Sequence, residues 1–255
     1  MRSAMRDWTF KELREVPKTS TLLIGMPDVG LVGLIASTYL VKKLKAEMVG
    51  YLDSRYLPPV ILYHEDKPLP VARFHYHTSD DTSFLILVSE VAVSPTGLHA
   101  LARELVEWAI SKGVERIIML GGVPTPQRMK LEKPRVYGAC VVRKDVEEVE
   151  KAGVNVFKEG FISGPYALLI KECYSRSLRG IALLAEAFLN YPDPGAAAAL
   201  LGTLHPLLGV EVDVKPLLEQ AEEIRIKLRE TMKRTLETMR ESGKAYEYTI
   251  PAMYL

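Results

Sequence analysis

Short runs of apolar residues alternate with stretches of helical periodicity along most of the chain. Continuous apolar runs at residues 22–24, 84–88 and 117–120, the last within a strand expected at 116–120, are bounded by polar, glycine or proline residues, which is typical of strands covered on both faces. Segments between them place apolar residues three or four apart and are expected to form helices. Strands that alternate with helices predict an α/β sandwich with a largely parallel sheet.

The stretch TLLIGMPDVGLVGL, residues 21–34, predicts a buried strand, a tight turn and the start of a helix. Pro27 cannot donate a hydrogen bond to a neighbouring strand, so the strand should end before it. Asp28 is expected to cap the helix, because its carboxylate can accept from the backbone N–H of Gly30 or Leu31.

A glycine-rich turn between a strand and a helix also suggests a phosphate site. The dinucleotide-binding pattern fails because Pro27 stands where its second glycine belongs, and the P-loop pattern fails because Leu31 and Val32 follow Gly30. Asp28 would also put a negative charge where the phosphate would lie. The turn is therefore interpreted as a packing turn, and no cofactor is predicted.

The rest of the first 190 residues predicts the remaining elements of the sandwich. Strands are expected at residues 48–52, 137–142, 154–157 and 180–184, and helices at 30–44, 97–112, 145–152 and 165–175. Residues 60–63 and 71–77 predict a hairpin that turns around residues 65–68. Its prolines favour the edge of the sheet.

A proline-spaced loop at residues 123–135 carries Arg128, Lys130, Lys133 and Arg135. We interpret it as a solvated loop, since loops with several charges usually face water. The alternative is a contact surface for an acidic partner.

The last third of the chain changes character. A small apolar helix is expected to open at Asp193, and a long helix to run from Pro216 to about Ser242. Apolar residues recur every three or four positions from Ala221 to Met239, and this stripe must be buried on its own domain or on a copy of itself. The predicted division is a sandwich core at 1–190, a helical extension at 191–243 and a flexible tail at 244–255.

Composition and charge narrow the classes of function. The 255 residues are 48% hydrophobic and 25% charged, so the chain can bury a sizeable core. Its net charge of +1 gives no general attraction to nucleic acid or to an anionic membrane.

Cys140 and Cys173 lie far apart without metal-site spacing, which favours a reducing compartment. No signal peptide or apolar membrane span is evident, so the cytoplasm is expected.

The last twelve residues read KAYEYTIPAMYL. Gly243 should end the long helix, and Pro251 should prevent it from resuming. Met253, Tyr254 and Leu255 then offer an apolar anchor, a phenol that can hydrogen-bond and a terminal carboxylate that can pair with a lysine. These features suit insertion into a partner's pocket, and a frayed or self-docked terminus is the alternative.

Five segments of the chain carry a family resemblance: GMPDVGLVG at 25–33, LPP at 57–59, FISGPYALLI at 161–170, YPDP at 191–194 and VD at 212–213. Together they resemble the proteasome assembly chaperone family in its archaeal branch. The resemblance implies a nucleoside-phosphorylase-like three-layer α/β/α sandwich that forms homo-oligomers and acts without nucleotide. It also implies that a hydrophobic-tyrosine-any terminus, here Met253, Tyr254 and Leu255, inserts between α subunits of the 20S proteasome, as a chaperone or as an activator.

The main alternative is an enzyme of the hydrolase or phosphorylase type in the same kind of sandwich. Glu90 follows a buried strand at the edge where α/β sheets bind ligands, so a pocket near Glu90 would be its centre. His99 is a second candidate, although the sequence shows no acidic partner for it. Ser163 lies one residue out of register for a nucleophile elbow.

Histidines at other positions give weaker signals. His75 and His77 share a strand face and could hold a metal, but no third ligand is evident and edge packing is favoured. His205 lies in an apolar helix and is expected in the core. No catalytic residue and no metal site is therefore predicted, and the chain is not expected to be an enzyme.

Overall fold

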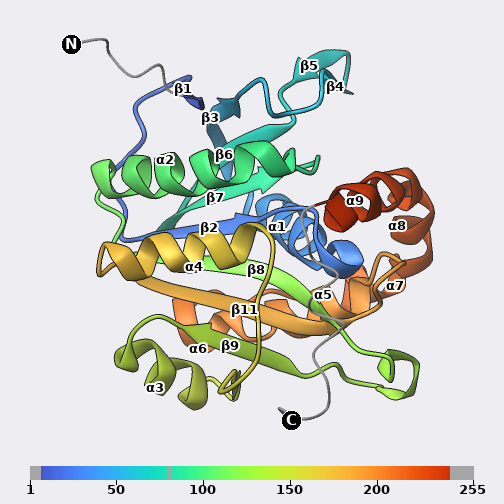
Figure 1. The fold of residues 1–255 in the computed structure, drawn as a ribbon. Coiled ribbons are helices and arrows are strands. Elements are labelled where there is room, and N and C mark those ends of the chain that lie inside the picture. The colour runs from blue at the N-terminus through green and yellow to red at the C-terminus, as the bar shows by residue number, and fades with distance from the viewer. Residues whose placement is uncertain (1–6, 80–81, 242–255) are drawn as a thin grey trace.

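The computed structural model describes residues 7–79 and 82–241, and within them the main sheet has nine strands (Figure 1). Their order is β1-β3-β6-β7-β2-β8-β11-β9-β10. The central strands β7, β2, β8 and β11 run parallel, and antiparallel pairs flank them. The strands of this sheet are β1 (Thr9–Glu12), β2 (Thr21–Gly25), β3 (Glu47–Asp53), β6 (Ala72–Thr78), β7 (Ser83–Ser89), β8 (Arg116–Pro124), β9 (Val136–Cys140), β10 (Asn155–Val156) and β11 (Arg179–Ala187).

Helices cover both faces of the sheet, so the predicted three-layer α/β/α sandwich is confirmed (Figure 1). One face carries α2 (Leu98–Ser111) and α4 (Pro165–Ser175). The other carries α1 (Val32–Leu44), α3 (Arg143–Lys151), α5 (Pro194–Leu201) and α6 (Leu204–Leu208). The chain then continues through α7 (Lys215–Glu219), α8 (Ala221–Lys227) and α9 (Arg229–Glu241).

The first predicted strand is the centre of the core. All five residues of β2 are buried, with Leu22 and Ile24 facing the α2–α4 layer and Leu23 facing the α1–α5 layer. Burying each such side chain stabilises the fold by about 1.5–3 kcal/mol. Because β2 pairs in parallel with β7 and β8, the turn after it lies at the carboxyl edge of the sheet.

The turn after β2 is built differently from the prediction. The side chain of Asp28 makes no capping hydrogen bond; its backbone oxygen accepts from Leu31 N at 2.9 Å instead. A short 3-10 turn, Val29–Leu31, precedes α1, and Gly30 and Leu31 both have positive φ angles. This left-handed kink turns the Asp28 carboxylate away from the N-terminus of α1, so the expected cap cannot form.

The predicted hairpin between residues 60–63 and 71–77 is wrong. Instead, β4 (Leu62–His64) pairs with β5 (Lys67–Leu69) in a small separate sheet, because Glu65 and Asp66 take positive φ angles in a tight turn. The strand β6 pairs in the main sheet with β3 and β7. A two-residue turn fixes which strands meet, and the apolar pattern did not reveal it.

The predicted long helix is present as three consecutive segments, α7, α8 and α9. Hydrogen bonds from Leu228 N to Ile224 O and from Met232 N to Leu228 O connect α8 to α9. The apolar stripe packs on the chain's own core, where Leu217 and Met232 are buried. The predicted boundaries at 190 and 243 remain predictions, and residues 242–255 lie outside the described structure.

The segment before β2 adds the edge strand β1, which pairs with β3. Trp8 is buried, and the ring of Phe10 stacks on that of Trp108 with centroids 5.2 Å apart. In the part of the chain that the structure describes, none of the helices has the length and apolar character needed to cross a bilayer.

Candidate functional site at the carboxyl edge of the sheet

Tyr166 joins three separate segments at the carboxyl edge of the parallel strands. Its hydroxyl donates to Leu120 O at 2.5 Å and accepts from Met26 N at 3.1 Å. A Cβ atom at Gly121 would lie 2.5 Å from the Tyr166 ring, so this position needs a glycine. Complete burial raises the pKa of the phenol, and the charge of Asp28 adds to the effect. The uncharged side chain of Tyr166 therefore links α4 to the ends of β2 and β8 by hydrogen bonds.

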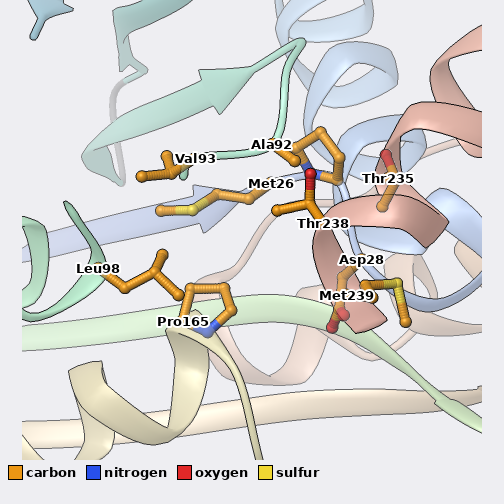
Figure 2. A pocket seen from close by; sticks show the side chains of 10 residues that line it. Met26, Asp28, Ala92, Val93, Leu98, Pro165, Thr235, Thr238 and Met239 are labelled. Carbon is orange, nitrogen blue, oxygen red and sulfur yellow. The ribbon is translucent and has the colours of Figure 1, made fainter. Parts of the chain in front are cut away.

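Helix α9 closes this edge from outside. Figure 2 shows Thr235, Thr238 and Met239 of α9 facing Met26 and Pro165 across a small cavity. The cavity measures about 30 Å³, which is room for one or two water molecules. Parallel α/β sheets usually bind their ligands at this edge. Here α9 leaves only this small cavity beside Met26 and Pro165.

Glu90 does line a larger cavity, of about 340 Å³, between the segment after β7 and α9. Its carboxylate accepts a hydrogen bond from Arg73 Nη2 at 2.6 Å, and this arginine is itself buried. Arg55 and Arg234 also line the cavity. The carboxylate is thus held in an ion pair with Arg73.

The structure does not assemble the other enzyme candidates around Glu90. His99 is exposed on α2 and is not among the residues that line the cavity. Ser163 lies half-buried in the segment before α4 and lines neither this cavity nor the smaller one. His205 is exposed on α6, so its predicted place in the core is wrong. Residue 205 lies on the outer side of a short helix whose Leu204 and Leu207 turn inward.

His75 and His77 lie on β6 as expected. His75 is buried, which together with the charge of Arg73 lowers its pKa to about 4. Burial also lowers the pKa of His77, and its ring contacts that of Phe84 with centroids 5.1 Å apart. Among residues 7–79 and 82–241, no group of three His, Cys, Asp or Glu side chains could hold a metal ion.

The prediction of a solvated loop between β8 and β9 is wrong for one of its four cations, Arg128, whereas the side chain of Arg135 is 61% exposed. Arg128 is buried and forms a two-pronged ion pair with Asp193, with N–O distances of 2.7 and 2.9 Å. Arg135 Nη2 pairs with the buried carboxylate of Glu186 at 2.6 Å. Lys130 and Lys133 are exposed, as expected for a solvated loop.

With this geometry in view, the chain can be compared with known proteins. The profile of the PAC2 family matches residues 22–232. The chain belongs to the PAC2 family. An uncharacterized protein of Methanocaldococcus jannaschii is 30% identical to this PAC2 chain over 222 residues, covering 87% of this chain and 89% of that protein.

Two crystal structures from Pyrococcus furiosus resemble this PAC2 chain over nearly its whole length. PbaA, described as an archaeal homolog of proteasome-assembly chaperone, is 30% identical and matches 91% of this chain and 100% of its own, with a TM-score of 0.82. PbaB, described as an archaeal proteasome activator, is 27% identical and matches 89% of this chain and 99% of its own, with a TM-score of 0.76.

Two of the segments that carried the family resemblance, 25–33 and 191–194, meet in this PAC2 structure. Asp193 accepts from the backbone of Phe188 and Ala196, and its own N–H donates to Gly30 O at 2.8 Å. Its partner Arg128 was missed by the sequence analysis. The sequence shows four cations in the loop and holds no sign of which one pairs with Asp193.

The predicted partner-binding residues Met253, Tyr254 and Leu255 lie outside the described residues. The residues that the structure describes end at Glu241, the last residue of α9. Their role stays a prediction.

Proposed function

We propose that this PAC2 protein is an ATP-independent chaperone for assembly of the 20S proteasome, or an activator of it. The observation that carries the proposal is the likeness to PbaA and PbaB, at 30% and 27% identity over about nine-tenths of the chain. PbaA is an archaeal homolog of proteasome-assembly chaperone, and PbaB is an archaeal proteasome activator. The proposed partners are the α subunits of the 20S particle.

The proposed contact is the terminal segment Met253, Tyr254 and Leu255. Fourteen residues follow Glu241 in the sequence, and fully extended they would span at most ~50 Å at ~3.3–3.6 Å each. Helix α9 ends at Glu241, and its Thr235 and Met239 pack on the carboxyl edge of the sheet. A methionine anchor, a phenol and a carboxylate could then enter a groove between two subunits.

We further propose that the protein works as a homo-oligomer in the cytoplasm. When several copies of one weakly binding tail are held in one oligomer, binding of the first tail raises the effective concentration of the others. The overall affinity for a ring of identical subunits then exceeds that of a single tail. Both cysteines are free thiols, in agreement with a reducing compartment.

Three side-chain arrangements support a role without nucleotide or catalysis. Tyr166 and Met239 occupy the edge where a nucleotide would bind, and Glu90 is engaged by Arg73. An enzymatic turnover that is lost on Glu90→Gln would contradict this part of the proposal and favour the hydrolase or phosphorylase alternative.

The binding test uses purified archaeal 20S particles immobilised on a biosensor. We expect deletion of residues 253–255, or Tyr254→Ala, to abolish binding while the far-UV spectrum and the oligomer mass stay unchanged. The matched control is Tyr248→Ala, which removes a phenol from the same segment and should leave binding within about threefold. Unchanged binding after the deletion would exclude the tail as the contact. An activator should raise the rate of peptide hydrolysis by mature 20S particles, whereas a chaperone should raise the yield of 20S particles from separate subunits.

A further inference from the structure

A second surface on this molecule is shaped to bind a peptide. A groove of about 470 Å³ separates the loop after β11 from α8 and α9. This volume lies within the range of ordinary ligand sites. The groove is distinct from the cavities at Glu90 and Met26, and the described residues that line it belong to the loop at 190–192 and to the helices at 222–236.

The loop side of the groove presents a fixed aromatic side chain. Tyr191 is 66% exposed, although its ring meets the edge of Phe188 with centroids 6.4 Å apart. The loop is closed by Asp193, which binds Phe188 N and Arg128 through its side chain and Gly30 through its backbone. The loop that carries Tyr191 is therefore held in place by these bonds, which limits the backbone entropy lost when a partner binds.

The helix side combines an apolar floor with a row of cations. Ile226 is 60% exposed, and Leu236 is half-buried beside it in the lining. Arg225, Arg229 and Lys233 are spaced four residues apart, which puts them along one face of α8 and α9.

The charge of the groove is not balanced within the described part of the chain. Glu222 is the one carboxylate in the lining, and it pairs with Arg225 at 3.2 Å. Among residues 7–79 and 82–241, no carboxylate lies within ion-pair distance of Arg229 or Lys233. The whole chain carries a net charge of only +1, so this excess of positive charge is local.

We propose that the groove is a docking surface for an extended acidic segment of a partner protein. The segment carries one apolar or aromatic side chain, which lies between Tyr191 and Ile226, and carboxylates that pair with Arg229 and Lys233. Complementary charge steers such a segment into the groove, and the exposed ring supplies the apolar contact. This surface goes beyond the proposed function, because it needs neither the terminal tail nor a proteasome.

The test measures fluorescence anisotropy of a labelled eight-residue peptide that has four aspartates around a central leucine–phenylalanine pair. The protein is the full chain at low salt. We expect Arg229→Glu/Lys233→Glu to weaken binding at least tenfold and Tyr191→Ala at least threefold. The matched control Lys227→Glu reverses a charge on α8 outside the groove and should change the Kd by less than twofold.

Two comparisons decide the chemistry of the occupant. A peptide with asparagine in place of each aspartate should bind at least tenfold more weakly, and added salt should weaken the acidic peptide. Equal binding of the two peptides, or wild-type binding by the double charge reversal, would overturn the proposal. Binding that occurs only after removal of residues 242–255 would also overturn it, because the chain's own terminal segment would then be the occupant.

Discussion

Replacing Asp193 tests whether the buried ion pair holds the carboxyl edge of the sheet together. The Asp193 side chain is fully buried and accepts four hydrogen bonds, two from Arg128 and one each from Phe188 N and Ala196 N. Asp193→Ala leaves the Arg128 guanidinium buried without its anion and removes the cap of α5. Breaking a buried pair in this way costs about 3–5 kcal/mol.

A second variant separates the charge from the cap. Asparagine is also a good helix N-cap, so Asp193→Asn keeps an acceptor for Ala196 N. It loses the negative charge and puts an amide donor where Oδ2 accepts from Arg128 Nε and Phe188 N. We expect it to destabilise the fold by about 3 kcal/mol, nearly as much as alanine. The matched control is Glu47→Ala, which breaks an exposed pair with Arg14 and should cost under ~1 kcal/mol.

Urea unfolding monitored by tryptophan fluorescence measures these differences. With a slope of ~3 kcal/mol per molar, Asp193→Ala should lower the midpoint by about 1–2 M. An Asp193→Asn midpoint within about 0.3 M of wild type would refute the reasoning, because the ion pair would then contribute little to the fold.

Two further substitutions probe the same sheet. Tyr166→Phe removes the hydroxyl that bridges Leu120 O and Met26 N, and it should cost about 1–3 kcal/mol in urea unfolding; a change below 0.5 kcal/mol would contradict that role. His75 has a folded-state pKa of about 4 against 6.5 when unfolded, so its neutral form stabilises the protein above pH 6.5 and this stability is lost as the pH falls towards 4. The free energy of unfolding of the wild type should therefore fall by ~3 kcal/mol more than that of His75→Leu between pH 7 and 4. Parallel profiles of this free energy against pH would disprove the role of His75.

The alternation of strands and helices could be read from the sequence, because buried parallel strands such as β2 and β7 are nearly continuous apolar runs. The predictions that were wrong depended on backbone torsion angles or on contacts between residues far apart in the sequence. Positive φ angles at Glu65 and Asp66 redirected the hairpin, and those at Gly30 and Leu31 removed the Asp28 cap. Glutamate and leucine rarely adopt positive φ angles, so Glu65 and Leu31 did not indicate these turns.

The candidate site was harder to predict than the fold. Glu90 lines a cavity as expected, yet its pairing with Arg73, seventeen positions away, depends on the pairing of β6 with β7. Arg128 meets Asp193 across 65 positions, and a single sequence holds no direct sign of which cation in a loop turns inward. The family resemblance was confirmed, and the tail that it singles out is still a prediction.

Native mass spectrometry of the protein, with and without 20S particles, tests the central claim most directly. We predict a species whose mass is that of the 20S particle plus one oligomer of this protein, and its disappearance when residues 253–255 are deleted. The absence of such a species with the full chain, or its persistence after the deletion, would contradict the proposed function.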